Sequence, residues 1–295
     1  MFELLEKLYL SGSDVYPEEP LRRWTSLAIG GKARALILPN SERALLEAIG
    51  ILRSAGYGFR IMGMGTNLLI SDEGIADFII NTSRLTGVHI EGNLVVADAG
   101  VPLKRLCQMA ASAGLSGLEQ LYGIPGSVGG AVFMNAGAYG KEVKDVLEWA
   151  ELLNEDRVVR LDASKLGLAY RRSNIRKRVI LKAAFRLKKD KPDVVWKRMD
   201  EFLRKRLEKQ PVFERSAGSL FKRPKPDFYV GSTLEKLGLK GFRVGDMMIS
   251  TKHAGFMINT GNGTFVDAVN LIDYVKRRVK ETHGVELETE VIIWK

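Results

Sequence analysis

Two glycine-dense segments constrain this chain more than any other feature of its sequence. The first, Gly63–Leu68, reads Gly-Met-Gly-Thr-Asn-Leu and follows a short apolar run, Phe59–Met62. The second, Gly123–Gly140, begins about 60 residues later and interleaves glycine with small residues. Because glycine has no Cβ, backbone amides in such segments can approach a flat or anionic ligand closely. Together the two segments predict one site for a large ligand that carries two phosphates and a planar ring.

Two common nucleotide-binding loops are excluded at the first segment. A Rossmann turn needs a third glycine where this chain has Leu68, and a Walker loop needs a Gly-Lys-Ser/Thr sequence that does not follow. Purely structural interpretations stay open. The first segment alone is also typical of a plain strand-to-loop turn, and Gly129 and Gly130 could serve a close contact between helices.

The remaining pattern alternates short strands with amphipathic helices, which favours a mixed fold. Strands are predicted over Ala33–Pro39, Phe59–Met62, Asp77–Asn81, Val88–Ile90, Leu94–Ala97, Val146–Leu153, Arg157–Leu161, Val179–Leu187, Phe256–Asn259 and Val285–Trp294. Helices are predicted over Glu42–Ser54, Val101–Ala113, Val194–Lys209 and Phe265–Thr282. Asn40 or Ser41 can cap the first of these, and Thr264 with Asp267 forms a capping box for the last. The polar stretch Asp190–Pro192 is interpreted as a linker, so a domain boundary is expected near residue 190.

Charge is distributed unevenly between the two halves of the chain. Residues 1–150 carry a net charge of −3 and residues 151–295 a net charge of +13. A basic half indicates an anionic partner, which could be a nucleic acid, a phosphorylated cofactor or a nucleotide-linked substrate. The aromatic residues there do not interleave with basic ones as in a known nucleic-acid module. We therefore expect a nucleotide-linked anion and no nucleic acid.

Several other classes are disfavoured by simple counts. The single cysteine, Cys107, excludes an intramolecular disulfide and a multi-cysteine metal site, and its place in a predicted helix favours a buried side chain. No His/Cys/Asp cluster has metal-ligand spacing, so no metal is expected. The first ten residues lack a basic and then apolar signal-peptide pattern, and no apolar run reaches the ~20 residues of a membrane span. We expect a cytoplasmic protein with no membrane partner.

Four further segments, taken in order with the two glycine segments, carry a resemblance. They are Thr25–Gly31, Tyr170–Ser173, Ser216–Pro224 and Leu287–Val291. The glycine segments resemble the flavin-binding domain of the vanillyl-alcohol-oxidase type. The whole set, from about Trp24 to Ile293, resembles the UDP-N-acetylenolpyruvoylglucosamine reductase family of peptidoglycan precursor synthesis. One departure is Thr66, where that family usually has serine; both residues supply a hydroxyl.

This resemblance implies a fold and a domain organisation. The expected fold class is α+β, with a two-lobed FAD-binding domain and a smaller α+β substrate-binding domain. We expect residues 1–189 to bind FAD, with lobes of about 20–85 and 86–189. Residues 190–284 are expected to bind the substrate, and residues 285–295 to form a C-terminal strand that carries a catalytic glutamate. The short chain between residues 187 and 194 resembles the shorter variant of the family, and the segment Lys209–Asp227 is the candidate for closing the site.

The resemblance also implies an activity and its catalytic residues. NADPH reduces noncovalently bound FAD and leaves, and UDP-N-acetylglucosamine-enolpyruvate then enters the same site. A hydride passes to the enol-ether double bond and a proton completes UDP-N-acetylmuramate. Ser219 is the expected proton donor, and Arg171 and Glu290 are expected near the substrate carboxylate, where they stabilise the intermediate. Without the resemblance, these residues would be interpreted as a turn serine, a surface arginine and an outward-facing glutamate.

The remaining site residues also follow from the match to the family. The expected cofactor-binding residues are Gly63, Met64, Gly65, Thr66, Asn67, Leu68, Pro125, Gly126, Ser127, Gly129, Gly130, Asn135, Ala136 and Gly137. The expected substrate-binding residues are Tyr170, Lys209, Lys222, Arg223 and His253. A monomer is expected. The alternative function is that of another FAD-dependent oxidoreductase of the same superfamily, acting on a hydroxy acid or a sugar lactone.

Overall fold

The structure, a computed structural model, describes residues 1–295 and divides them into two compact units. Unit 1 comprises Met1–Pro17, Arg34–Met64 and Asp77–Lys205, and unit 2 comprises Glu18–Ala33, Gly65–Ala76 and Arg206–Lys295. Both units mix helices with strands, as an α+β fold requires. No helix combines the length and the apolar composition needed to cross a lipid bilayer.

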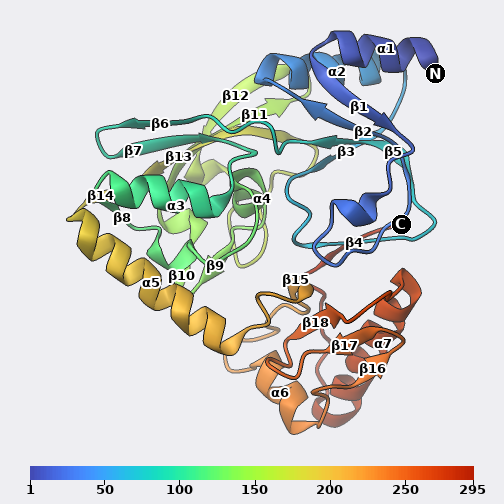
Figure 1. Ribbon diagram of the computed structural model, residues 1–295. Helices are drawn as coiled ribbons and strands as arrows, with labels where there is room; N and C mark the ends of the chain where they lie inside the picture. The colour runs from blue at the N-terminus through green and yellow to red at the C-terminus, as the bar shows by residue number, and fades with distance from the viewer. The chain divides into compact units, whose positions relative to one another are not determined.

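The first lobe of unit 1 is a four-stranded sheet with two helices. The strand order is β1-β2-β5-β3, in which β1 and β2 are antiparallel and β3 and β5 are parallel. The elements are α1 (Phe2–Leu10), β1 (Ser13–Pro17), β2 (Ala33–Pro39), α2 (Glu42–Ser54), β3 (Phe59–Met62) and β5 (Ile75–Asn81). Helices α1 and α2 pack on each other and on β1 (Figure 1). The first glycine segment begins directly after β3 of this lobe.

The second lobe of unit 1 is a five-stranded antiparallel sheet of order β12-β11-β13-β7-β6. Its strands are β6 (Val88–Glu91), β7 (Leu94–Asp98), β11 (Leu147–Asn154), β12 (Arg157–Asp162) and β13 (Val179–Arg186). Its helices are α3 (Leu103–Ser112), α4 (Val128–Phe133) and α5 (Pro192–Lys209). Two short ladders join β8 (Leu115–Ser116) to β14 (Lys188–Lys189) and β9 (Gly137–Ala138) to β10 (Lys141–Glu142).

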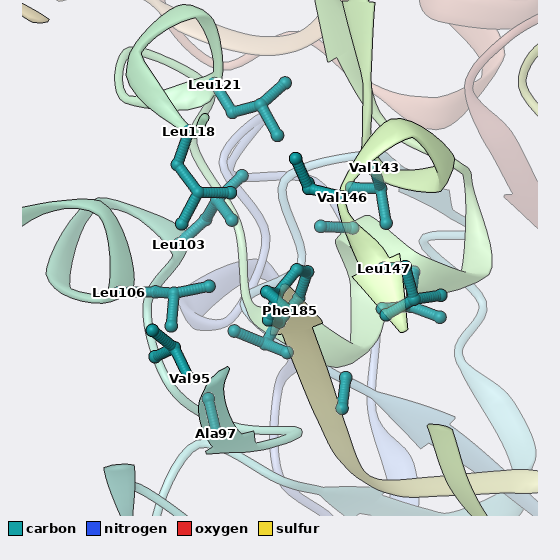
Figure 2. Close-up of a cluster of buried hydrophobic side chains, with 14 of the residues drawn as sticks. Val95, Ala97, Leu103, Leu106, Leu118, Leu121, Val143, Val146, Leu147 and Phe185 are labelled. Carbon is teal, nitrogen blue, oxygen red and sulfur yellow. The ribbon is translucent and has the colours of Figure 1, made fainter. Parts of the chain in front are cut away.

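Two apolar clusters hold unit 1 together. In the larger one, Phe185 of β13 is fully buried among side chains that include Val95, Leu106, Leu121 and Leu147 (Figure 2). Helix α4 packs on β7 and β13, so the glycine segment that contains it lies on this core. The second cluster contains side chains of both lobes, and the lobes therefore share one apolar core.

Unit 2 is built on a four-stranded antiparallel sheet of order β15-β18-β17-β16. Its elements are β4 (Leu68–Ile70), β15 (Arg215–Ser219), α6 (Val230–Lys236), β16 (Arg243–Val244), β17 (Met247–Ile249), β18 (Phe256–Asn259), α7 (Phe265–His283) and β19 (Ile292–Trp294). The last strand pairs in parallel with β4. One apolar cluster joins side chains of the sheet, of α6 and α7 and of residue Leu69. The end of the chain is thus tied to the segment that follows the first glycines. Short 3₁₀ turns complete the two units at Leu21–Arg23, Glu119–Leu121, Val143–Asp145 and Ala163–Lys165.

The helix signals predicted from the sequence are confirmed. Ser41 caps α2 by accepting a hydrogen bond from the Ala44 amide at 3.1 Å. At α7 the Thr264 hydroxyl accepts from the Asp267 amide at 3.1 Å, and the Asp267 carboxylate accepts from the Thr264 amide at 3.0 Å. Cys107 is buried in α3, where burial raises the pKa of its thiol. A structural role for this cysteine follows.

Two expectations need correction, and one helix was not predicted. Pro192 is the first residue of α5 and not part of a linker, because proline lacks only an amide that has no partner in the first helical turn. The second glycine segment contains a short helix, α4, that glycine content concealed. The final strand covers Ile292–Trp294 alone, since the preceding residues bond to a different segment: the Glu290 amide donates to the Leu220 carbonyl, and the Glu288 carbonyl accepts from the Lys222 amide.

The compact units follow a different division from the domains expected from the sequence. The units separate between Lys205 and Arg206, and unit 2 includes two segments from the first 76 residues. Compactness of packing and the binding of a particular ligand are separate properties, so the functional boundary at residues 189 and 190 stays a prediction.

Candidate active site

The first glycine segment begins where β3 ends, and its glycines are required by close packing. A Cβ at Gly63 would lie 2.4 Å from the Ser127 hydroxyl oxygen. The two glycine segments, about 60 residues apart in sequence, therefore touch at Gly63 and Ser127, as one shared site requires. The carbonyl oxygen of Gly63 accepts a hydrogen bond from the side-chain amide of Asn81 at 2.9 Å. Asn81 is a buried supporting residue that the sequence analysis did not identify; its place at the end of β5 was the available signal.

Gly65, in unit 2, is required for a second reason. Its φ of +64° lies in the left-handed region, and a Cβ there would lie 2.0 Å from the Trp24 carbonyl oxygen. The Ser26 amide donates to the Gly65 carbonyl at 3.2 Å. Segment Thr25–Gly31, singled out in the sequence, thus packs on the first glycine segment.

The second glycine segment turns into α4 at Ser127, whose hydroxyl accepts from the Gly130 amide at 3.3 Å. The next amides also have protein acceptors: Val128 donates to Val101 and Gly129 to Ala99, both at 2.8 Å. A Cβ at Gly129 would lie 3.0 Å from the Ala99 Cβ. Gly129 is therefore a packing glycine, and these amides serve the fold.

Gly130 differs from its neighbour. It is exposed, and a Cβ there would meet nothing closer than the Ser127 hydroxyl oxygen at 3.5 Å. The protein itself does not need glycine here, so the bare backbone leaves room for something outside the chain. Exposed apolar side chains flank the glycines, with Met64 after Gly63 and Phe133 at the end of α4. A surface poor in side chains and edged by apolar groups fits a flat aromatic cofactor such as the flavin of FAD.

Asn135 organises the loop after α4. Its φ is +43° and its side chain is fully buried. The side-chain amide donates to the Glu142 carboxylate at 3.1 Å and to the Ala169 carbonyl at 3.0 Å, and its oxygen accepts from the Lys144 amide at 2.9 Å. The side chain is thus committed to the protein, and a cofactor contact at this position would come from the backbone.

Segment Tyr170–Ser173 docks on this same loop. Arg171, with φ of +53°, donates from Nη2 to the Gly137 carbonyl at 2.8 Å, and its guanidinium lies 5.0 Å from the centre of the Tyr170 ring. The Ser173 hydroxyl donates to the Phe133 carbonyl at 2.7 Å. Unit 1 therefore fixes the guanidinium of Arg171 against the glycine-rich backbone.

Unit 2 brings together Ser219 and Glu290. Strand β15 is irregular between Ser216 and Ser219, with φ of +80° at Gly218, and Ser219 pairs with Phe256 of β18. The next residue, Leu220, accepts the Glu290 amide through its carbonyl at 2.9 Å. Glu290 thus bonds through its backbone to the residue that follows Ser219.

Asn67 has a position that the sequence did not reveal. Its side-chain amide donates to the Glu290 carbonyl at 3.1 Å, and its own carbonyl accepts from the Ile292 amide at 3.0 Å. Asn67 is expected to bind the cofactor, and these two hydrogen bonds show that it also holds the backbone on both sides of Val291. The tertiary structure therefore links the first glycine segment to Glu290.

The expected substrate-binding cations of unit 2 have varied surroundings. Lys222 forms an ion pair with Glu288 at 2.6 Å, and the guanidinium of Arg223 lies over the Tyr229 ring at 4.6 Å from its centre. Lys209 is exposed at the last residue of α5. His253 is half-buried, and its Nδ1 accepts a hydrogen bond from the Gly255 amide at 3.0 Å. One ring nitrogen of His253 is thus used within the protein.

Comparison with known proteins identifies the chain first at the level of the class. Residues 33–161 match the family described as FAD binding domain, so the chain is a flavin-binding oxidoreductase. Residues 210–294 match the family described as UDP-N-acetylenolpyruvoylglucosamine reductase, C-terminal domain. The chain belongs to the UDP-N-acetylenolpyruvoylglucosamine reductase family.

Individual relatives cover the whole chain. The protein named UDP-N-acetylenolpyruvoylglucosamine reductase from Thermotoga sp. (strain RQ2) is 48% identical over 296 residues, which span 100% of this chain and 98% of the relative. The one from Caldanaerobacter subterraneus subsp. tengcongensis (strain DSM 15242 / JCM 11007 / NBRC 100824 / MB4) is 42% identical, over 98% and 97% of the two chains. The crystal structure of UDP-N-acetylenolpyruvylglucosamine reductase from Thermus caldophilus is 34% identical and superposes with a TM-score of 0.82 over 96% of this chain and 99% of that one. The α+β fold predicted from the sequence is confirmed.

Proposed function

We propose that this protein reduces UDP-N-acetylglucosamine-enolpyruvate to UDP-N-acetylmuramate, with noncovalently bound FAD as cofactor and NADPH as hydride donor. The observations that carry the proposal are the contacts between family segments within each of the two units. Gly63 meets Ser127, Arg171 is fixed on Gly137, and Ser219 lies beside the Leu220–Glu290 hydrogen bond.

Each proposed catalytic residue has a role that its chemistry permits. The FAD, when bound, supplies the transfer of a hydride from NADPH to the enol-ether double bond. Negative charge then grows on the substrate carboxylate, where Arg171 binds it with a two-pronged guanidinium. Ser219 gives its hydroxyl proton to the carbon beside the carboxylate, which completes the lactyl ether. Glu290, protonated or hydrogen-bonded through an intermediary, stabilises the same intermediate.

The other roles and the biological setting belong to the same proposal. Residues 1–189 form the FAD-binding domain, residues 190–284 the substrate-binding domain, and the C-terminal strand carries Glu290. Tyr170, Lys209, Lys222 and Arg223 contact the nucleotide-linked substrate. The protein works as a cytoplasmic monomer in peptidoglycan precursor synthesis, and the basic charge of residues 151–295 suits a diphosphate substrate.

The decisive test of this function follows the two half-reactions separately. Under anaerobic conditions NADPH should bleach the flavin absorbance, and UDP-N-acetylglucosamine-enolpyruvate should then restore it with formation of UDP-N-acetylmuramate. Bleaching of the oxidised flavin by a hydroxy acid or a sugar lactone, each of which would donate a hydride to it, would identify another oxidoreductase of the superfamily. Failure of both substrates to change the flavin spectrum would refute the proposed reaction.

Gly130 offers a sharper test of the FAD site than Gly129. We expect Gly130→Ala to stabilise the cofactor-free protein slightly. The helix propensity of alanine is more favourable than that of glycine by up to about 1 kcal/mol, and the added Cβ has room. The same Cβ should raise the Kd for FAD at least tenfold, which corresponds to about 1.4 kcal/mol. Thermal melting of the cofactor-free protein and titration with FAD measure the two effects.

A matched control exists in α2. Gly50 is also an exposed helical glycine with open space at its Cβ, so Gly50→Ala should give the same stabilisation and unchanged FAD affinity. Gly129→Val is less informative, because crowding against Ala99 would damage the fold itself. Unchanged FAD affinity in Gly130→Ala would contradict the placement of the cofactor on α4.

A further inference from the structure

The imidazole of His253 occupies a space that two glycines leave for it. A Cβ on Gly231 would lie 2.7 Å from the His253 Cε1, and a Cβ on Gly255 would lie 2.9 Å from the same atom. The ring also meets Phe256 edge-on, with centres 5.0 Å apart. Any larger residue at either glycine would displace the ring. Unit 2 therefore contains a fitted site for this side chain.

The hydrogen bond of the ring defines which nitrogen the protein uses. The Gly255 amide donates to Nδ1 at 3.0 Å, so Nδ1 carries no proton and a neutral ring carries its proton on Nε2. A contact with a substrate could involve Nε2 alone. His253 is expected from the sequence to contact the substrate, and this hydrogen bond indicates a structural use of the ring.

The residue that donates to His253 is part of a ladder that ends at the proposed catalytic residues. The Gly255 carbonyl accepts from the Leu220 amide at 2.9 Å, and the Leu220 carbonyl accepts from the Glu290 amide at 2.9 Å. Phe256, against which the ring packs, is the β partner of Ser219. Three successive hydrogen bonds thus connect the imidazole to Glu290, with Ser219 directly beside the middle one.

Ser219 depends on this ladder because the pairing of β15 with β18 is irregular directly before it. That pairing is interrupted between Ser216 and Ser219, and the left-handed Gly218 lies in the gap. Beyond the gap, the backbone is held by the pairing of Ser219 with Phe256 and by the two hydrogen bonds of Leu220, to the Gly255 carbonyl and from the Glu290 amide. A shift of the turn that contains these residues would move the hydroxyl.

We propose that His253 is a positioning residue: by accepting the Gly255 amide at Nδ1 it fixes the turn 253–256, and through Leu220 it sets the placement of Ser219 and Glu290. This inference rests on the proposed roles of those two residues. It assigns His253 an effect on proton delivery to the substrate, with no required contact with the substrate itself.

The inference includes a pH dependence, because only a neutral ring can accept at Nδ1. Burial is the main cause that holds the pKa of His253 below its usual value, and Lys240 lowers it further. A hydrogen bond with the backbone at His253, the second-largest cause, and Glu235, in the helix that contains Gly231, act in the opposite direction. The lowered pKa favours the neutral ring, and acidification below it would protonate Nδ1 and remove the acceptor. The oxidative half-reaction should lose rate on that acid side.

Two amide substitutions separate the nitrogens of the ring. In His253→Asn the amide oxygen can take the place of Nδ1, whereas in His253→Gln the longer side chain reaches the place of Nε2. We expect His253→Asn to keep flavin reoxidation by substrate within about threefold of wild type and His253→Gln to slow it about 10- to 100-fold, as a misplaced reacting group does. Reduction of the flavin by NADPH should stay unchanged in both, and the acid loss of rate should disappear in His253→Asn.

A measurement without substrate keeps this test independent of activity and of the proposed reaction. Nitrogen-15 NMR of the wild-type imidazole should show an unprotonated Nδ1 and a protonated Nε2, and thermal melting should confirm that both variants fold. The opposite tautomer, or a fast His253→Gln beside a slow His253→Asn, would overturn the positioning role in favour of a contact through Nε2. Equal rates in both variants would show that the ring has no such role. A wild-type protein that never reoxidises with the nucleotide substrate would instead refute the proposed function.

Discussion

Replacing Ser219 by alanine should slow the oxidative half-reaction by about 10²- to 10⁴-fold, the contribution of a positioned general acid. Flavin reduction by NADPH needs no proton from this hydroxyl and should stay within a few-fold of wild type. Because the position is only half-buried and its pairing with Phe256 uses backbone atoms, alanine should preserve the fold. Stopped-flow absorbance of the flavin resolves the two halves.

Two further variants sharpen this prediction. Ser219→Cys should recover part of the rate, since a thiol can donate a proton from nearly the same position. Ser216→Ala is the matched control on the same strand: its hydroxyl donates to the Met257 carbonyl at 2.9 Å, so its loss should lower stability and spare both half-reactions. Equal slowing of both halves in Ser219→Ala would mean that the side chain only shapes the site.

Replacing Arg171 by lysine should reduce the oxidative half-reaction by about 10²- to 10³-fold, the effect of losing one oriented donor to a developing negative charge. Lysine keeps the positive charge but cannot donate to the Gly137 carbonyl and to a carboxylate in the fork geometry of a guanidinium. The Km for substrate should rise as well, because the ground-state carboxylate also uses this cation. Single-turnover kinetics with pre-reduced enzyme separate the two effects.

The adjacent arginine provides the control for this change. Arg172 is exposed, and its backbone pairs with Ala169. Arg172→Lys should therefore leave both half-reactions unchanged. An equal loss in the two variants would assign the effect to the general basic charge of this segment, and an unaffected Arg171→Lys would remove the guanidinium from the mechanism.

The sequence predicted the local elements well where one short signal sufficed. The caps of α2 and α7 are encoded by Ser41 and by Thr264 with Asp267, residues within three positions of the amides that they bond. The strands predicted over Val88–Ile90 and Leu94–Ala97 are β6 and β7, which pair with each other. Such features depend on nearest neighbours along the chain, so no knowledge of the fold is needed to predict them.

Elements that depend on remote partners were predicted less accurately. Residues 285–291 have an apolar pattern suited to a strand, but their hydrogen bonds change partner from Leu220 to the Asn67 segment, and only Ile292–Trp294 form a strand. Helix α4 was hidden because its glycines disfavour a helix in isolation, and packing on β7 and β13 stabilises it.

The sequence by itself determined the family, the flavin cofactor and the residue types available for catalysis, because short motifs and their order along the chain are sufficient to identify them. Only the tertiary structure decided what each site residue does for its neighbours. Gly129 packs against Ala99, while Gly130 faces open space. The side chain of Asn135 bonds within its loop, and His253 accepts a hydrogen bond from the Gly255 amide. These roles depend on distances between atoms of segments far apart in the chain, and such distances exist only once the apolar cores have fixed those segments together.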